Sequence, residues 1–574
     1  MSLTVATNSP ATKMSGAEII VGILAAHGVE RLHVYPGGTI APVVDRAVAS
    51  GMGIYCARHE QGAGYAALAA ARRRGTPQVV MVTSGPGVTN LVTAVADGYY
   101  DSTPLIVITG QVGTADLQRS RELRQRGFQE ADALSILGSV TKAGFQPKNG
   151  ADLVNDLAEA FRIAVDGRPG PVVIDVPMDV QRSEQPVAPL PGQAKREPAP
   201  QVSGRQIGEV VEWLSRAQRP LVIAGQGVLL AQAQTQLREL LRLAPMPVSH
   251  SLLGLGAVPG DFILNLGFHG HTGTQAAGCA IQECDFLLVL GSRLDLRQTG
   301  TETAQFAPDA RIVRVEADDS EIAHARVRID RTLRGDVGAV LDALNAGIGR
   351  VALPDWSAWH ARIEALKAEH ALQYGPGLKP QAIIEEAAKL TRGLEVDVVS
   401  GVGSHQQWVA RHFDFDHPRR RWLTSGGHGA MGFDLPVAAG AQLDDPGRMV
   451  LCFVGDGSVQ MNIQELAALV EYDLPVKIVV LDNRRLGIVS QFQLLNWAAD
   501  PTCGRKRNPD FAAIARGYGM TGLTLNRVED MQPRLRELIA TPGPALLHCL
   551  VDEAEDVSPM LLPGQTLDRM WRNG

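Results

Sequence analysis

Paired cysteines, aromatic residues, strong net charge and long apolar runs are all scarce in this sequence. Its six cysteines include no Cys-x-x-Cys pair, so neither a disulfide framework nor a zinc site is predicted. The net charge of −7 and the absence of basic stretches interleaved with aromatics give no reason to expect nucleic-acid binding. The N-terminus is polar, and no run approaches the ~20 apolar residues of a membrane helix. Together these absences favour a cytoplasmic protein.

Short apolar strands alternate with amphipathic helices along most of the chain. Examples are a helix that Ser15 opens, followed by a strand at 31–35, and a later strand at 220–225. This alternation is typical of α/β proteins with parallel sheets. We predict three doubly wound domains joined by linkers. The expected boundaries are a flexible tail at 1–14, a first domain at 15–184, a proline-rich linker at 185–202, a middle domain at 203–350, a linker helix at 351–378 and a third domain at 379–574.

A glycine turn in the third domain carries the strongest local signal. An apolar strand at 449–454 leads into Gly455, Asp456, Gly457 and Ser458, and the next strand, 476–481, is followed by Asp482 and Asn483. Glycine lets backbone N–H groups approach a phosphate, and carboxylate and amide oxygens at adjacent strand ends suit Mg²⁺. This segment therefore predicts a metal-bridged diphosphate site, although a bare Gly-Asp-Gly is more often a plain turn.

Three strand ends in the first domain carry further candidates. Glu60, the stretch 84–87 and the pair Gly110 and Gln111 each follow or end a predicted strand. Ligands of open α/β sheets gather beyond the carboxyl ends of the strands, so one shared site is expected there. For Glu60 the alternative is a surface acid paired with Arg58.

The Gly-Asp-Gly segment with its later Asn is similar to the signature that thiamine-diphosphate enzymes use to hold Mg²⁺ and the cofactor. Along nearly its whole length the chain resembles the catalytic subunit of acetohydroxyacid synthase, also called acetolactate synthase. The stretches that carry this resemblance are 35–38, 58–62, 83–90, 109–112, 128–130, 141–142, 423–427, 431–433, 453–457, 460–466, 486–487 and 558–567, the last as a C-terminal lid.

The resemblance implies roles for individual residues. Glu60 would share a proton with the cofactor's aminopyrimidine, and Gln111 and Lys142 would act with it in catalysis, although a plain surface lysine is an equal reading for Lys142. Asp456, Asn483 and the Arg485 carbonyl would bind the metal. The other implied cofactor residues are Pro36, Gly37, Gly85, Asn90, Gly403, Ser404, His405, Gln406, Gly429, Met431, Gly455, Gly457, Ser458, Met461, Leu486 and Gly487, and the implied substrate residues are Gly38, Phe128, Gln129, Ile488 and Phe492.

The family's activity is then the expected function. It is decarboxylation of a 2-oxo acid, pyruvate in the first instance, and addition of the hydroxyethyl unit to a second 2-oxo acid, giving 2-acetolactate-type products. The alternative is another thiamine-diphosphate-dependent decarboxylase or lyase with a non-pyruvate acceptor. A homodimer at least, or a tetramer, with sites between subunits is implied, and a small regulatory subunit is a further partner that the resemblance leaves open.

Three departures from the family pattern bear on the acceptor and on FAD. The segment 116–126 is longer and more basic than expected; it predicts either a solvated helix face with Glu122 paired, or a lid whose arginines bind an anionic substrate. Phe492 stands where the family has a Trp that favours 2-oxobutyrate. The middle domain contains stretches that resemble FAD-contacting residues of the family, at 291–293, 297–300 and 335–336. A further flavin-contacting motif of the family corresponds either to 271–273 or to the nearby 268–270. A purely structural middle domain is the alternative, so FAD stays open.

Overall fold

The computed structural model describes residues 12–187, 190–192, 201–497, 504 and 507–573. Its contacts divide the chain into two units, which are described separately. Unit 1 is residues 1–197 with 439–444, and unit 2 is residues 198–438 with 445–574. Most of the tail predicted at 1–14 and much of the linker predicted at 185–202 lie outside the described residues. Thr12–Ser15 and Glu184–Val187, at the edges of these segments, form the antiparallel strands β1 and β8.

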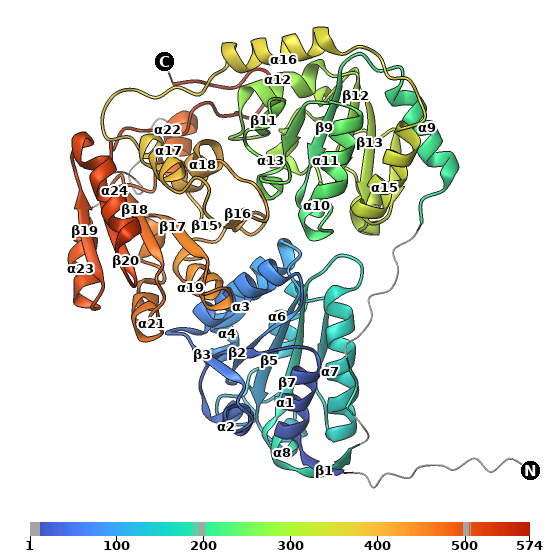
Figure 1. Ribbon diagram of the computed structural model, residues 1–574. Helices are drawn as coiled ribbons and strands as arrows, with labels where there is room; N and C mark the ends of the chain where they lie inside the picture. Colours follow the sequence, from blue (N-terminus) through green and yellow to red (C-terminus); the bar gives the residue numbers. More distant parts are fainter. Residues whose placement is uncertain (1–11, 188–189, 193–200, 498–503, 505–506, 574) are drawn as a thin grey trace, which may run out of the picture. The chain divides into compact units, whose positions relative to one another are not determined.

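Unit 1 contains one six-stranded parallel sheet in the order β3-β2-β4-β5-β7-β6. Helices cover both of its faces (Figure 1), as expected for a doubly wound domain. Its elements are β2 (Arg31–Tyr35), β3 (Gly53–Cys56), β4 (Gln78–Val82), β5 (Leu105–Gln111), β6 (Ala143–Phe145) and β7 (Pro171–Pro177), with α1 (Gly16–Ala26), α2 (Ala41–Ala49), α3 (Glu60–Arg74), α4 (Pro86–Tyr100), α5 (Thr114–Leu117), α6 (Ala133–Leu137), α7 (Gly150–Val165) and α8 (Met178–Arg182).

The local sequence explains why these elements form. Ser15 caps α1 through a reciprocal bond with Glu18, and the strands are rich in β-branched residues that are buried on both faces. Apolar side chains of α1, α2 and α7 pack on one face of the sheet, around Ile20, Leu157 and Ile106. Helix α3 begins at Glu60, and the side chain of His59 caps it by accepting a hydrogen bond from the Gln61 N–H.

Unit 2 contains two further six-stranded parallel sheets. The first has the order β11-β10-β9-β12-β13-β14. Its elements are β9 (Pro220–Ala224), β10 (Val248–His250), β11 (Asn265–Phe268), β12 (Phe286–Leu290), β13 (Arg311–Glu316) and β14 (Arg331–Arg334), with α9 (Gly204–Leu214), α10 (Gln226–Leu230), α11 (Gln234–Leu243), α12 (Gln275–Glu283), α13 (Leu296–Thr299), α14 (Asp319–Ala323) and α15 (Val337–Ile348).

The helix expected at 351–378 is present as α16 (Ser357–Glu369). It belongs to the first sheet of unit 2, because Trp359 and Ile363 are part of that sheet's core. The Trp359 indole N–H donates to the carbonyl of Pro220, 3.0 Å away. Because these side chains are buried against the first sheet of unit 2, α16 packs as part of the middle domain.

The second sheet of unit 2 has the order β16-β15-β17-β18-β20-β19. Its elements are β15 (Val396–Ser400), β16 (Arg420–Thr424), β17 (Met449–Gly455), β18 (Lys477–Asp482), β19 (Thr521–Leu525) and β20 (Ala545–Leu550), with α17 (Pro380–Leu390), α18 (Ser404–His412), α19 (Asp434–Asp444), α20 (Asp456–Val459), α21 (Leu466–Glu471), α22 (Gly487–Trp497), α23 (Phe511–Gly517) and α24 (Met531–Ala540). The predicted α/β class with three doubly wound parallel sheets is therefore confirmed.

The C-terminal tail crosses unit 2 and is held by a buried arginine. Arg411 on α18 donates to the carbonyls of Thr272, Ser558 and Pro559 at 2.5–2.8 Å. Burial lowers the pKa of Arg411 to about 9. The guanidinium thus joins α18 to two other segments, at Thr272 and at Ser558–Pro559, through backbone carbonyls. The Gln491 carboxamide adds a reciprocal pair of bonds to Val557, so the segment expected to be a lid is fastened at several points.

Replacing Arg411 with leucine is expected to destabilise unit 2 by about 2–4 kcal/mol, because several buried carbonyls lose a charged donor at once. Denaturant unfolding should show the loss, and limited proteolysis should release the tail faster. Arg569 lies on the same tail with its side chain 81% exposed, so Arg569→Leu is the control and should change stability by less than about 0.5 kcal/mol. Equal stability of the two variants would contradict a fastening role for Arg411.

Candidate active site

Two groups of predicted residues gather, one in each unit. In unit 1 they lie at the carboxyl ends of β2 to β5. Glu60 opens α3 and is only 5% exposed. The Asn90 amide on α4 donates to Glu60 Oε2 at 3.0 Å, while Oε1 has no hydrogen bond within the described part of the chain. The carboxyl group is therefore fixed by one oxygen and open at the other.

The neighbouring turns of unit 1 complete this group. Thr39 Oγ1, just after Pro36 and Gly37, lies 2.9 Å from Thr83 Oγ1 and accepts from the Ser84 N–H. Gly85 has a left-handed φ of 62°, and a Cβ there would lie 2.8 Å from the carbonyl of Gln129. Only glycine fits such a conformation and approach without strain. Gly85 and Gln129 are thus adjacent, as the shared site requires, and Phe128 beside them is 85% exposed.

Gln111 and Lys142 do not lie together. Gln111 ends β5 at the carboxyl edge and is buried. Lys142 precedes β6, at the amino edge of the sheet, where its Nζ donates to the carbonyls of Ile163 and Asp166 at 2.6 and 2.5 Å. That bonding caps the end of α7 and accounts for the lysine. The structure therefore brings Gln111, and not Lys142, to the edge of the sheet that carries Glu60, and the catalytic role expected for Lys142 stays a prediction.

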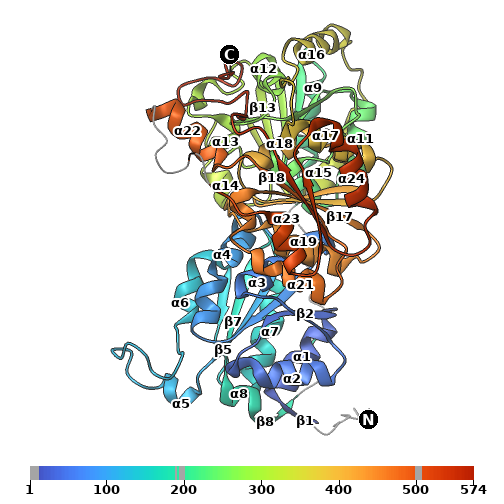
Figure 2. The same cartoon turned by 90° about the vertical axis from the view of Figure 1, so that its left-hand side faces the viewer.

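The arginine-rich segment 116–126 lies in unit 1 and projects from it as a long loop beside α5 (Figure 2). Only Thr114–Leu117 is helical, so the expected helix face is wrong, and Glu122 has no ion pair among the described residues. Arg126 is buried at the base, paired with Glu130 at 2.8 Å and donating to the carbonyl of Leu117. Arg121 and Arg124 are exposed. The loop is thus braced internally while two guanidiniums face solvent.

In unit 2 the predicted diphosphate residues converge at the ends of β15, β17 and β18. Asp456 follows β17 and Asn483 follows β18, and these strands are adjacent and parallel. Gly487 opens α22, and a Cβ there would lie 2.6 Å from Ser404 Oγ and 2.7 Å from Asn483 Nδ2. The buried hydroxyl of Ser404 has no hydrogen-bond partner in the described part of the structure. An unsatisfied donor beside a helix N-terminus is what an anion such as diphosphate would bind.

The Gln406 side chain is bonded to a neighbouring loop. Its amide N–H groups donate to Thr424 Oγ1 and the Ser425 carbonyl at 2.8 and 2.9 Å. Ser425 Oγ in turn accepts from the backbone of Gly429 and Ala430. Gln406 therefore holds the loop that carries Gly429 and Met431, and Ser404 rather than Gln406 offers the free polar atom. Met431 reaches the turn, since a Cβ on Gly457 would lie 3.2 Å from its Cε and 2.5 Å from Leu486 Cδ2.

Sequence reasoning missed Asp434, which organises this group. It is fully buried and accepts from the Gly401 N–H and the Ser458 hydroxyl. Ser458 Oγ also accepts from the Gly432 N–H at 2.9 Å, and His405 Nε2 lies 3.5 Å from the Asp434 carboxylate. One carboxylate thus links three glycine turns. An acid placed directly after the glycine loop 424–432 was the available signal.

The environment of Asp456 was also unexpected. Asn508 donates to both Asp456 and Asp482, at 2.6 and 2.7 Å, and His548 Nε2 lies 2.8 Å from Asp482. Burial, with the nearby Asp482 charge, raises the pKa of Asp456 to about 7, although the Asn508 bond opposes the rise. For Asp482, burial is outweighed by hydrogen bonds from His548 and Asn508, which lower its pKa. Nothing in the sequence predicted the part played by Asn508.

These residues fit a hard cation and a diphosphate. Asp456 and Asn483 offer oxygen ligands of the kind Mg²⁺ prefers. In the described residues no group of three or more His, Cys, Asp or Glu side chains could hold a metal. The predicted Arg485 is close by, its N–H 3.4 Å from Asn483 Oδ1. Met461, by contrast, is 55% exposed.

Comparisons with known proteins agree with this arrangement. Three family models match: the thiamine pyrophosphate enzyme N-terminal TPP binding domain over residues 14–136, the central domain over 207–344 and the C-terminal TPP binding domain over 401–549. The chain is 37% identical to the acetolactate synthase isozyme 2 large subunit of Escherichia coli over 563 residues, covering 97% of this chain and 99% of that protein. The chain belongs to the acetolactate synthase family of thiamine pyrophosphate enzymes.

Other family members show a similar degree of likeness. Identity is 39% with the acetolactate synthase isozyme 1 large subunit of Escherichia coli, covering 97% of this chain and 98% of that protein. With the acetolactate synthase of Mycobacterium bovis it is 37%, covering 97% and 91%. This acetolactate synthase homologue is therefore a thiamine-pyrophosphate-dependent enzyme, and the resemblance noted in its sequence is confirmed. Along the described chain no helix is both long and apolar enough to span a bilayer.

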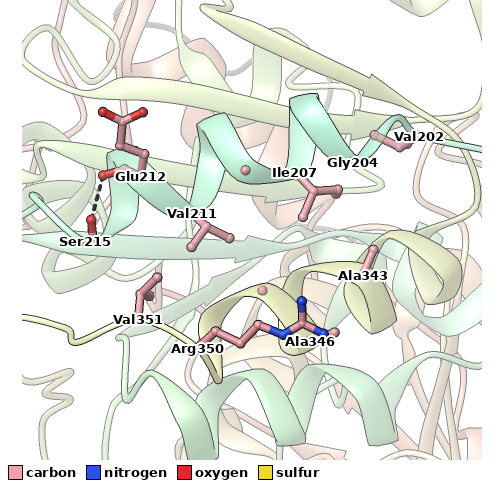
Figure 3. Close-up of a pocket in the computed structure, with 12 residues that line it drawn as sticks. Val202, Gly204, Ile207, Val211, Glu212, Ser215, Ala343, Ala346, Arg350 and Val351 are labelled. Atoms are coloured by element: carbon pink, nitrogen blue, oxygen red, sulfur yellow. Dashed lines mark hydrogen bonds between the residues drawn. The ribbon is translucent and has the colours of Figure 1, made fainter.

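A separate groove of about 570 Å³ lies in unit 2, away from these candidate residues (Figure 3). It runs between α9 and α15, with Ile207 and Val211 on one side and Ala343 and Ala346 on the other. Arg350 is its basic residue. None of the residues that the sequence nominated lines it, so it is distinct from both groups described above.

Proposed function

We propose that this enzyme decarboxylates a 2-oxo acid, with pyruvate as the first candidate, and joins the hydroxyethyl unit to a second 2-oxo acid, giving 2-acetolactate-type products. The observation that carries the proposal is the buried Glu60, held through Oε2 by Asn90 and open at Oε1. Bound thiamine diphosphate supplies the carbon nucleophile and holds the electrons released with CO₂. The printed names of the relatives, acetolactate synthases, support the same reaction.

The roles of the chain's own residues follow from their bonding. Glu60 holds a proton at Oε1 and exchanges it with the aminopyrimidine ring, while Asn90 keeps the carboxyl group in place. Asp456 and Asn483 would hold Mg²⁺, and Ser404 with the α22 N-terminus would bind the diphosphate oxygens. Met431, supported through Gln406 and Ser425, would contact the ring system. Gln111 borders the space for the acceptor, and Gly38, Ile488 and Phe492 are its proposed walls.

FAD is proposed as a second cofactor, bound at the first sheet of unit 2. Glycine turns meet at the carboxyl ends of β9 and β12, where Gly227 N–H donates to the Gly291 carbonyl at 3.0 Å. The buried His250 and His269 each leave Nε2 without a hydrogen bond in the described chain. Ring nitrogens that lack a hydrogen bond could bind the polar groups of a ligand, and the neighbouring glycine turns could let it approach the backbone. This arrangement favours a ligand-binding middle domain over a purely structural one.

We further propose a homodimer as the smallest active form, a tetramer and a small regulatory subunit as larger assemblies, and a cytoplasmic location. The exposed Phe128, beside Gly85 and Gln129, supports burial of this edge against a second copy. Relatives that are named large subunits support the regulatory partner. In the dimer, Glu60 of one copy would serve the Asp456 group of the other.

The reaction is tested by mass spectrometry of products from the purified protein with thiamine diphosphate, Mg²⁺ and pyruvate. Parallel samples add 2-oxobutyrate or FAD. Acetolactate that forms only with the cofactor is the expected result, and a yield that rises with FAD is expected if the flavin completes the fold. Because Phe492 replaces the family's Trp, pyruvate is expected to be preferred over 2-oxobutyrate as acceptor. No consumption of pyruvate under any of these conditions would contradict the proposal.

A second candidate function is ligation or lysis with a non-pyruvate acceptor that carries another negative charge. It is favoured by the braced loop at the carboxyl edge, which presents Arg121 and Arg124 to solvent. Guanidiniums bind carboxylate, phosphate or sulfonate groups with two parallel hydrogen bonds. Residues just after the loop contact Gln111 and Gly85, through the Ala131 carbonyl and Gln129, and this contact supports a role of the loop in acceptor binding.

Under this second function, the double variant Arg121→Ala, Arg124→Ala should raise KM for a dianionic acceptor such as 2-oxoglutarate by about tenfold or more, since a charged hydrogen bond is worth about 1.5–3 kcal/mol. Its KM for pyruvate should stay the same. The double variant Arg205→Ala, Arg569→Ala removes equal charge from exposed positions in unit 2 and is the control. Steady-state kinetics with both acceptors measure the effect, and unchanged constants would leave pyruvate as the acceptor.

A further inference from the structure

Asp175 is a fully buried carboxylate in unit 1 that receives hydrogen bonds from two neighbouring strands. It lies on β7 opposite Thr109 of β5, whose hydroxyl donates to Oδ1 at 2.7 Å. Oδ2 accepts from Gln111 Nε2 at 2.9 Å and from Gln146 Nε2 at 2.8 Å. Gln146 directly follows β6. The carboxylate thus joins the ends of three adjacent strands through neutral donors.

The charge on Asp175 is not explained by stability. Burial raises its pKa to about 6, the three hydrogen bonds partly oppose the rise, and the charge of Asp132 adds to it. Because the pKa is higher in the folded than in the unfolded chain, stability present at low pH is lost as pH rises to about 6. At neutral pH the ionised group therefore costs stability. A buried charge with such a cost is a candidate for a functional role.

Gln111 is the residue whose orientation this charge decides. Both of its amide hydrogens are used, one toward Asp175 and one toward the Ala131 carbonyl at 2.8 Å. Its Oε1 accepts from the Val112 N–H at 2.8 Å. A carboxamide oxygen accepts two hydrogen bonds, and the Val112 N–H is the one donor to Oε1 among the described residues, so its second acceptor position is unused there. An ionised Asp175 can only accept, as can the Ala131 carbonyl, so together they exclude the flipped amide.

We propose that Asp175 is a positioning residue that fixes the Gln111 carboxamide, so that Gln111 offers its oxygen and not its amide N–H to the reacting molecules. This inference rests on the proposed function, because it assumes that Gln111 borders the acceptor site. Gln111 then accepts a hydrogen bond from a hydroxyl group formed in the reaction and cannot donate to an acceptor's carboxylate. Through Ala131, the same contact ties the base of the arginine-rich loop to the sheet.

The variant Asp175→Asn tests the inference. The uncharged amide can point its Oδ1 toward Gln111 and Gln146 while Thr109 turns to accept from Nδ2, or it can point its Nδ2 toward them. The Asn side chain therefore no longer excludes a flipped Gln111 amide. Product formation from pyruvate is expected to fall at least tenfold, while thiamine diphosphate affinity stays within twofold and the melting temperature is equal or higher. Hydrogen exchange at residues 112–131 should speed up. The last readout needs no activity, so a wild-type protein that forms no product would sink the proposed function without deciding the role of Asp175.

Thr109→Val is the second variant, because it removes a donor to Asp175 without touching Gln111. The wild-type rate should fall below a midpoint near pH 6, where Asp175 becomes protonated and no longer fixes the amide. Loss of the Thr109 bond raises that midpoint and leaves the rate at high pH unchanged. A shared pH profile in wild type and both variants would overturn the inference. So would an Asp175→Asn protein that loses activity, cofactor affinity and thermal stability together, since that is a structural role.

Discussion

Glu60→Gln is expected to lower product formation by about 10²–10⁴-fold, the usual contribution of a positioned acid or base. The glutamine keeps the size of the side chain and can still accept from Asn90, so the local fold should not change. It cannot hold an exchangeable proton at Oε1, which is the property that the proposed reaction requires. Thiamine diphosphate should still bind, because the residues of the diphosphate group are untouched.

Product formation and calorimetric cofactor binding measure these two effects separately. The control is Glu159→Gln, the same chemical change at a half-buried, Arg162-paired position of α7 away from the site, and it should behave as wild type. Turnover by Glu60→Gln at the wild-type rate, with any substrate that the wild type uses, would show that the proton is held elsewhere.

Asp456→Ala is expected to have the second large effect, on cofactor binding. It removes the carboxylate ligand proposed for Mg²⁺, and losing even groups that only support a metal ligand costs about 10–100-fold in affinity or activity. We expect thiamine diphosphate with Mg²⁺ to bind at least 100-fold more weakly. Without cofactor the variant should be as stable as wild type or more so, since a buried carboxylate with a raised pKa is removed.

Calorimetric titration of thiamine diphosphate in the presence of Mg²⁺ measures the loss. Asp473→Ala, at an exposed turn between α21 and β18, is the matched control and should bind normally. Cofactor affinity equal to wild type in Asp456→Ala would move the metal site to other residues.

The two variants together test the dimer. If Glu60 of one copy serves Asp456 of the other, a mixed dimer of Glu60→Gln and Asp456→Ala contains one intact site. Random exchange should then restore about a quarter of the wild-type activity, as expected for a two-fold symmetric assembly with sites between subunits. No recovery after mixing and refolding would place both groups in one chain's site.

Much of this protein was determined by local sequence. The strand at Arg31–Tyr35 and the segment from Met449 to Asp456 were predictable because short, largely apolar runs that end at glycine turns are typical of buried strands. The resemblance in motifs such as 453–457 likewise identified the family. Asp456 and Asn483 came together because the ends of adjacent parallel strands must meet at one edge.

Tertiary structure decided which polar atoms are free. The sequence predicted Lys142 as an active-site residue. In the structure its Nζ donates to two backbone carbonyls at the C-terminal end of α7. The Gln406 amide is likewise bonded to the loop after β16, while the Ser404 hydroxyl has no partner in the described part of the structure. Asn508 and Asp175 act through partners far away in the chain, so no local pattern marked them, whereas the glycine loop before Asp434 was a local signal. Hydrogen-bond partners are settled by long-range packing, whereas strands and glycine turns are settled largely by neighbours in sequence.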